Sequence, residues 1–398
     1  MNLSVQKPMI FLKNNFFYFT HYVSLIRNTN IVNYMGTNTV EKFPNSRKNI
    51  DFHKPTLSKE ELQTVLDCLV DDLMDTGSIV EKFEKDFKST FKLKNVISVN
   101  SLFAAYHLTL LSLGVKEGDS VLMSAMAPLP ALYAVLLVKA RPVLVDLAKS
   151  SFHMDPEIFL SKKNSENPVV ILLDHPFGCI QNLSKYEVGD TPVIEDYSEA
   201  LGADSETISV GKQGSVSICG LAPMHVITTG NGAFITTPND TLAETIRSYK
   251  YLPGLKKKST SMIKFEYNLL DFQAAIGIEQ ISKLGVIIER KKKIAQVYLQ
   301  AVMSSSHETY FQKASEDQFN RFPVIVSKSF DEVDRYYKSL QIGIDRVIQE
   351  PLYKILGLQN QDYPNTERLY QRGHCIPIYP NLTKDNVSRI SNSIKGLF

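Results

Sequence analysis

Cysteine is scarce in this 398-residue sequence, and its four copies lie far apart at Cys68, Cys179, Cys219 and Cys375. None belongs to a Cys-x-x-Cys pair or lies near a cluster of histidines. This spacing argues against a metal site and against the disulfide framework of small secreted domains. We therefore expect no bound metal and a cytoplasmic protein.

Net charge is nearly absent too, at +2, which gives no reason to expect a nucleic acid or an anionic membrane as partner. Hydrophobic residues make up 43% and charged residues 22%, as in ordinary soluble globular proteins. The length exceeds the roughly 250–300 residues at which a single hydrophobic core stops growing, so we expect two domains.

A long uninterrupted apolar run is missing as well. Residues 9–26 are rich in apolar side chains, but Lys13, Asn14, Asn15 and His21 interrupt them, so no transmembrane segment is predicted. A signal peptide's compact apolar stretch and cleavage site are also lacking. The segment can be an amphipathic surface anchor, but we favour a leader outside the fold over residues 1–49, with Met35 as an alternative start.

From residue 50 onward, the pattern is typical of an α/β domain. Ser58 and Glu61 form a capping box that opens a helix, and a second helical period follows at 80–87. Short runs apolar on both faces indicate strands of a parallel sheet covered by helices. We expect strands at 96–99, 120–123, 142–145, 169–173 and 193–194, and helices at 104–113, 131–140 and 242–251.

The last part of the chain has a different character. An amphipathic helix at 272–283 continues as a basic helix at 289–302. A strand at 322–326 and a helix at 331–340 follow, then a strand near Cys375 and a helix capped by Thr383. We therefore predict a large domain at 50–285 and a small α+β domain at 286–398.

Two segments carry the chemical signals. Residues 192–203 run an apolar strand into Asp196, with Glu199 and a Gly202-Ala203 turn after it. Residues 214–236 read as a small-residue strand, a loop ending in His225, a glycine-rich turn and a second strand. With landmarks from about residue 50 to the C-terminus, such as 274–284 and 376–380, they resemble the DegT/DnrJ/StrS sugar aminotransferase family.

This resemblance implies the pyridoxal phosphate (PLP)-dependent transferase fold type I, with a mostly parallel central sheet flanked by helices. It also implies PLP or its aminated form PMP as cofactor, a nucleotide-linked sugar as substrate, and a homodimer. By the same resemblance, Asp196 pairs with the pyridine nitrogen of the cofactor. Its position at a strand end suits a ligand site, although an aspartate there can equally cap the turn that follows.

His225 is the residue that discriminates between activities. Counted from Gly214, the lysine that holds the cofactor covalently in the family falls on His225. Imidazole cannot form that bond but can act as a base near neutral pH. The branch of GDP-4-keto-6-deoxymannose 3-dehydratase carries this change, and an acidic residue such as Glu199 also resembles that branch. The alternatives are a loop histidine left after catalysis decayed and an exposed turn carboxylate.

Four departures weaken the expected cofactor site. Ser101-Leu102-Phe103 replaces the phosphate-binding Ser-Gly-Thr, which leaves the backbone N–H groups of Leu102 and Phe103 as candidate cofactor contacts at a helix N-terminus. Gly220 replaces a serine and Pro128 replaces the aromatic residue that stacks on the ring. Glu266 stands in the segment where the family has Asn-x-Arg. Since each lost hydrogen bond to a charged group costs roughly 1.5–3 kcal/mol, we expect weakened PLP binding.

Three functions remain open at this point. The first is a 3-dehydratase-like enzyme with His225 as base and Glu199 as a second acid. The second is a catalytically degenerate homologue that acts as a scaffold or regulatory partner. The third, an ordinary sugar aminotransferase, needs another lysine, and Lys212 and Lys264 are out of register. The basic run 255–258 is read as a solvated loop or a nucleotide contact, and His175 as a packing residue.

Overall fold

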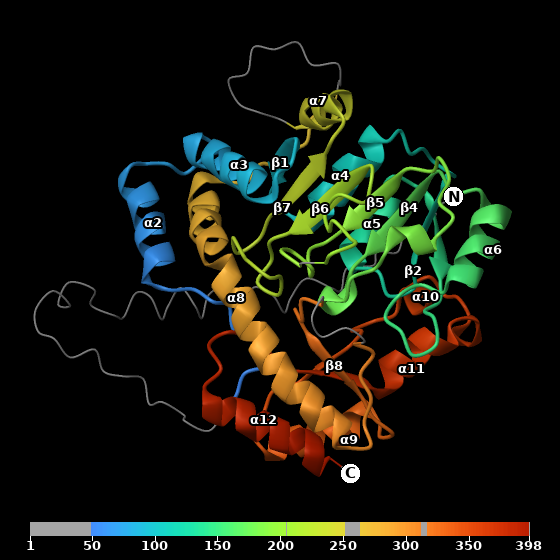
Figure 1. The fold of residues 1–398 in the computed structure, drawn as a ribbon. Helices are drawn as coiled ribbons and strands as arrows, with labels where there is room; N and C mark the ends of the chain where they lie inside the picture. Colours follow the sequence, from blue (N-terminus) through green and yellow to red (C-terminus); the bar gives the residue numbers. More distant parts are fainter. Residues whose placement is uncertain (1–48, 204, 251–262, 312–316, 398) are drawn as a thin grey trace, which may run out of the picture. The chain divides into compact units, whose positions relative to one another are not determined.

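The computed structural model describes residues 49–203, 205–250, 263–311 and 317–397 (Figure 1). The predicted leader, apart from its last residue, and the basic run at 255–258 lie outside these residues. The predicted capping box is confirmed, since the backbone N–H of Ser58 donates to Glu61 Oε2 at 2.9 Å. It opens α2 (Lys59–Val70).

A seven-stranded sheet organises most of the chain, in the order β1-β7-β6-β5-β4-β2-β3. Its strands are β1 (Asn95–Val99), β2 (Ser120–Ser124), β3 (Arg141–Val145), β4 (Val170–Asp174), β5 (Val193–Asp196), β6 (Val216–Gly220) and β7 (Ala233–Thr237). Only β7 runs antiparallel to its neighbours, while the pairs from β6 to β3 are parallel. The mostly parallel sheet that the sequence predicts is confirmed.

Helices cover both faces of this sheet (Figure 1). On one face Ile194 and Leu172 pack in a core with α4 (Leu102–Ser112), α5 (Leu129–Leu137) and α7 (Asp240–Tyr249). On the other face Val193 and Ile171 pack with α6 (Pro156–Glu166), and Phe234 packs with α3 (Ser78–Phe91) and the start of α8 (Asp271–Met303). Successive strand residues point to opposite faces, so β5 sends Asp196 to the same side as Ile194.

The predicted helix at 131–140 is three residues too long at its C-terminal end. It corresponds to α5, which ends at Leu137, because Lys139 adopts a left-handed φ of 58°. That residue belongs to the turn that leads into β3. The helices predicted at 272–283 and 289–302 are one helix of 33 residues, α8, which therefore crosses the predicted domain boundary. The division into two domains stays a prediction.

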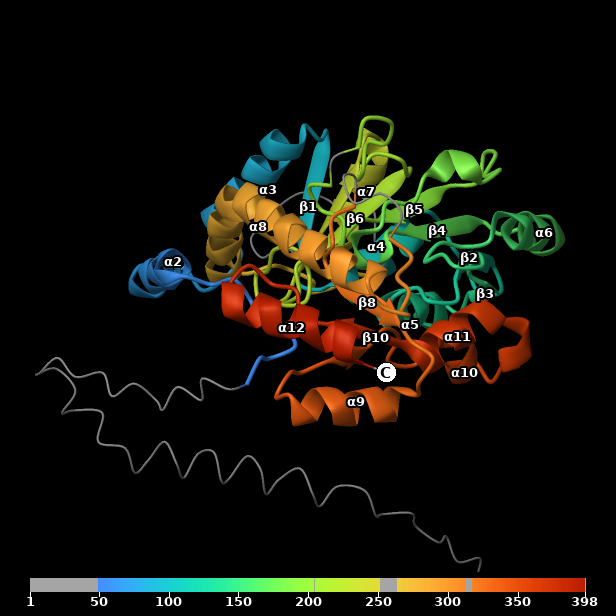
Figure 2. The same ribbon diagram turned by 60° about the horizontal axis from the view of Figure 1, so that its bottom comes forward.

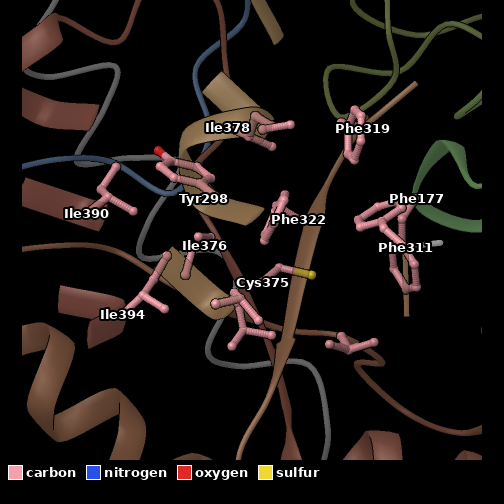
Figure 3. Packing of buried hydrophobic residues seen from close by; sticks show 14 of the residues in the cluster. Phe177, Tyr298, Phe311, Phe319, Phe322, Cys375, Ile376, Ile378, Ile390 and Ile394 are labelled. Carbon is pink, nitrogen blue, oxygen red and sulfur yellow. The ribbon is translucent and has the colours of Figure 1, made fainter. Parts of the chain in front are cut away.

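The second half of α8 packs against a small antiparallel sheet in the order β8-β10-β9. Its strands are β8 (Phe322–Ile325), β9 (Asp345–Arg346) and β10 (Gly373–Ile376), and the helices of this part are α9 (Phe330–Ser339), α10 (Leu352–Ile355), α11 (Pro364–Arg372) and α12 (Lys384–Gly396). Figure 2 shows α8, α9 and α12 gathered around β8 and β10. Phe177, from the loop after β4, belongs to the same core (Figure 3), which ties that loop to the C-terminal part.

Among the described residues, no helix combines the length and apolar character that crossing a membrane requires. The four cysteines are buried and unpaired. No group of His, Cys, Asp and Glu side chains in the described part of the chain has an arrangement that could hold a metal ion.

Candidate active site

A cavity of about 370 Å³ lies at the carboxyl ends of the central parallel strands. It brings together Asp196, Glu199 and His225, the three side chains to which the sequence assigns chemistry. Leu102 at the start of α4 and Pro128 at the start of α5 also line it, as do Arg321 and residues 345–350 from the C-terminal part. Phe103 is not among the lining residues, and its ring stacks on His107 instead. Ligands of open α/β sheets bind at this edge.

Asp196 is held in place by three hydrogen bonds. Its Oδ1 accepts hydrogen bonds from the backbone N–H of Ser198, at 2.8 Å, and from the Ser198 hydroxyl. Its Oδ2 accepts one from the hydroxyl of Tyr106, which is fully buried in α4. Burial and the Asp196 charge raise the pKa of Tyr106 well above its usual value, so the phenol stays a donor. Three donors therefore fix the orientation of the Asp196 carboxyl group.

His225 reaches the cavity from the loop between β6 and β7. Its Nδ1 accepts a hydrogen bond from the backbone N–H of Ala222 at 3.0 Å, which places the proton of the neutral ring on Nε2. Burial lowers the pKa of His225, while the charges of Asp196 and Glu199 act in the opposite direction. The ring is therefore neutral near pH 7 and is able to exchange a proton.

Two side chains fix the backbone of this loop from outside. A ring nitrogen of His53 contacts the carbonyl oxygen of Pro223, and the amide of Asn320 donates to the carbonyl oxygen of Met224 at 2.9 Å. Lys291, buried in α8, donates in turn to Asn320 Oδ1 at 2.9 Å. Burial lowers the pKa of Lys291 to about 8. These contacts could not be predicted from local sequence patterns, because the residues lie far apart along the chain.

Gly220 and His225 are sterically coupled. A Cβ atom at position 220 would overlap the imidazole ring of His225, at 2.6 Å from its Nδ1. A side chain at position 220 therefore requires the His225 ring to move from its observed position.

We expect Gly220→Ser to lower the free energy of unfolding by about 2 kcal/mol, as overpacked core sites do. His225→Gly removes the ring, so the double variant should recover most of this loss. Urea unfolding of the two single variants and the double variant measures the coupling. Additive effects of the two substitutions would show that the overlap does not matter.

Glu199 is committed to an ion pair with Arg321. The guanidinium approaches Glu199 Oε1 through Nε at 2.6 Å and Oε2 through a terminal nitrogen at 3.1 Å. The backbone N–H of Phe177 adds a third donor at 2.6 Å, and Arg321 lies over the Phe177 ring. Burial disfavours the ionised carboxylate, but the Arg321 charge outweighs this and lowers the pKa of Glu199. Arg321 is a site residue that the sequence did not reveal.

The end of the cavity at the N-terminus of α4 offers few side-chain hydrogen-bond donors. The Ser101 hydroxyl caps α4 by accepting from the backbone N–H of Ala104 at 3.1 Å. The Glu266 side chain is exposed, and its carbonyl oxygen accepts from the Asn100 amide beside the start of α4. Backbone N–H groups at the N-terminus of α4 are therefore the principal anion-binding groups there.

No lysine of the described residues lines this cavity. Lys212 lies at a separate hollow with Lys92 and Lys94, and the Lys264 ammonium group contacts the carbonyl oxygen of Ser248. His175, read as a packing residue, is buried and contacts Glu195 at 3.0 Å on the opposite face of the sheet.

Residues 55–395 match the sequence profile of the DegT/DnrJ/EryC1/StrS aminotransferase family. The chain belongs to this family. Its resemblance to the family, predicted from the sequence, is thereby confirmed over nearly all of the described residues.

Among its relatives, GDP-perosamine synthase of Escherichia coli O157:H7 is 26% identical over 366 residues, which cover 88% of this chain and 99% of that protein. The aminotransferase TlmJ of Streptoalloteichus hindustanus has a similar structure, with a TM-score of 0.80 at 20% identity over 87% of this chain and 98% of that one. The structure of E. coli GDP-4-keto-6-deoxy-D-mannose-3-dehydratase with bound hydrated PLP is also similar, with a TM-score of 0.79 at 20% identity. The match covers 87% of this chain and 100% of that one. The predicted fold type I of PLP-dependent enzymes is confirmed.

The residues of the cavity fit a cofactor that is held without a covalent bond. The Asp196 carboxyl group lines the cavity, where it is placed to pair with a ring nitrogen. His225 fills the space over Gly220, and no lysine among the described residues lines the cavity to hold the cofactor covalently. The part of the cavity beside Asp196 therefore suits the ring of PLP or PMP. Binding of the phosphate at the N-terminus of α4 would depend on backbone N–H groups.

Proposed function

We propose that this protein is a 3-dehydratase-like enzyme that removes water from a nucleotide-linked 4-keto-6-deoxysugar with a non-covalently bound PMP or PLP cofactor. One observation carries the proposal: the imidazole of His225, which we align with the family lysine, lines an open cavity together with Asp196. A relative named GDP-perosamine synthase and a structural neighbour named as a sugar 3-dehydratase support the class of substrate.

In the proposed reaction His225 moves the proton. His225 takes the proton from a C–H bond, and the C–O bond of a neighbouring hydroxyl group breaks. The proton and the hydroxide leave together as one water molecule. When bound, the aminated cofactor supplies the electron sink for this elimination. The ring nitrogen that carries no proton accepts the proton released from the C–H bond. The Gly220 backbone raises the pKa of His225 through a hydrogen bond, which favours uptake of that proton.

Asp196 would pair with the ring nitrogen of the cofactor, because hydrogen bonds from Tyr106 and Ser198 hold its carboxyl group in place. We assign Glu199 to holding Arg321 at the cavity wall rather than to acid catalysis, because an acid must carry a proton and Arg321 favours the charged form. Arg321 is the one permanently cationic side chain among the described residues that line the cavity, and it would attract an anionic part of the substrate.

The test is to incubate the protein with PMP and a GDP-linked 4-keto-6-deoxysugar and to follow water loss by mass spectrometry. We expect turnover that falls by about 10²–10⁴-fold in His225→Asn, which keeps a polar group near the position of Nδ1 but cannot transfer the proton. Wild-type protein that binds neither PMP nor PLP at millimolar concentration would refute the proposal.

A second candidate, a catalytically degenerate scaffold or regulatory partner, is favoured by the scarcity of side-chain donors at the phosphate end. It predicts that a heterologous protein purifies with this chain in stoichiometric amount. A homodimer that binds PMP and has no other partner contradicts it.

A dehydratase of this class would act in the cytoplasm, with its cysteines reduced.

We also propose that the chain forms the homodimer implied by its family. The outer side of α2 exposes an apolar stripe at Leu62, Leu66, Leu69 and Val70, of which Leu62 is 70% and Val70 74% exposed. Contiguous apolar surface of this kind is typical of protein interfaces. Gel filtration with light scattering measures the mass directly.

A further inference from the structure

The cavity contains a second aspartate that no part of the proposed function uses. Asp174 ends β4 as Asp196 ends β5, and the two are register partners in this parallel pair of strands. Leu172 and Ile194, two residues earlier on each strand, both pack on the α4 face of the sheet. Asp174 and Asp196 therefore project to the same side, and both line the cavity.

The surroundings of the two carboxyl groups differ sharply. Asp196 receives hydrogen bonds from Tyr106 and from the backbone and hydroxyl of Ser198. The Asp174 carboxyl receives none from any other residue in the described part of the chain, although 6% of the residue remains exposed. Two buried carboxyl groups side by side cannot both ionise readily, so one keeps a proton. The group without donors is the one that keeps it.

We propose that Asp174 is a further ligand-binding residue, whose protonated carboxyl group donates a hydrogen bond to an acceptor oxygen of the bound cofactor. The choice of ligand rests on the proposed function, whereas the protonated carboxyl group does not. Neighbouring strands lie about 4.8 Å apart, so the two carboxyl groups are spaced to meet two polar atoms of one ring. Asp196 would take the nitrogen and Asp174 an oxygen.

The electrostatic surroundings agree with this division. Burial, with the neighbouring Asp196 charge adding to it, raises the pKa of Asp174 to about 7, and His175 acts in the opposite direction. The titratable and charged groups around Asp174 come from several elements: Asp196 of β5, Glu199 after it, Tyr106 of α4, His175 and Tyr186 after β4, and His225 and Arg321 across the cavity. Asp174 is therefore the carboxyl group that changes charge near neutral pH.

Binding of PMP to wild-type protein and to Asp174→Asn, followed by calorimetry from about pH 6 to about pH 8, tests the role of the proton. Asparagine keeps the shape and a donor at every pH. The ratio of the two dissociation constants cancels the titration of PMP and of His225. We expect similar affinities at the lower pH and about tenfold weaker binding by wild type at the higher pH, where Asp174 loses its proton. A ratio that does not change, or that moves the other way, overturns the proposal.

Asp174→Val is the matched variant without a donor, and we expect it to bind PMP weakly at both pH values, with a circular dichroism spectrum like that of wild type. Infrared spectroscopy of ligand-free protein detects the protonated carboxyl group without any cofactor. We expect its band in wild type, titrating near pH 7, and no such band in Asp174→Asn. If this band is present but PMP binds to no variant, the proposed function fails and so does the cofactor contact. If the band is absent from wild type, the protonated carboxyl itself is refuted.

Discussion

Replacing His225 with lysine is expected to turn a protein that binds PLP reversibly into one that holds it covalently. The side chain at this position already lines the cavity in front of Asp196, and glycine at position 220 leaves room beneath it. An amine placed there would face the same cavity. Borohydride treatment followed by mass spectrometry should show one PLP per chain in His225→Lys and none in wild type. The amount of covalently bound PLP should therefore change from almost none to about one molecule per chain.

His225→Gln is the matched control, because it provides a polar side chain of similar reach without an amine. It should bind PLP as weakly as wild type and should yield no covalent adduct. An adduct in wild type would instead show that another lysine reaches the cofactor, which would revive the aminotransferase alternative. No adduct in His225→Lys, with PLP present in excess, would mean that the cavity does not accept the cofactor.

The fold was largely predictable from the sequence because its signals are local. Short runs that are apolar on both faces predicted the parallel strands, and Ser58 with Glu61 and Thr383 predicted helix starts that are confirmed. α6 was missed although Asp155 caps it and Pro156 begins it, because its apolar positions show no helical period. Where the chain continues as a single helix, as in α8, no local signal marks whether two domains meet.

The site was predictable only where its residues end strands or interrupt a motif. Asp196 and His225 met those conditions, and the structure places both in one cavity. Asp174 ends a strand as Asp196 does, so the same reasoning applied to β4 would have found it. Arg321 could not be found in this way, because its partner Glu199 lies 122 residues away and no pattern connects them.

The Glu199–Arg321 pair leads to the second large prediction. The two side chains are only 17% and 28% exposed, so their charges are compensated mainly by each other. In Glu199→Gln the guanidinium remains buried beside a neutral amide. Breaking a buried pair from one side costs about 3–5 kcal/mol, and the partial exposure here places the expected loss of free energy of unfolding near the lower end, at about 3 kcal/mol. Urea unfolding measures this loss.

Glu289→Gln is the control, because Glu289 forms an ion pair of similar length with Lys293 on the surface of α8, where the two side chains are 67% and 62% exposed. It should leave the free energy of unfolding unchanged within the error of the measurement, because exposed ion pairs contribute little to stability. If Glu199→Gln lowers the free energy of unfolding as little as this control does, the Glu199–Arg321 ion pair makes no net contribution to stability.

The pH dependence of the same variant distinguishes the charge of Glu199 from its shape. Since the pKa of Glu199 is lowered in the folded protein, its ionised form contributes stability above the unfolded pKa of about 4.3. That contribution is lost as the pH falls through the folded pKa, when the carboxylate takes up a proton. The stability difference between wild type and Glu199→Gln should therefore be constant from neutral pH down to about 5 and narrow below about 4. A difference that persists unchanged into acid would come from the altered shape of the side chain, and the cavity wall would then depend on packing rather than on the ion pair.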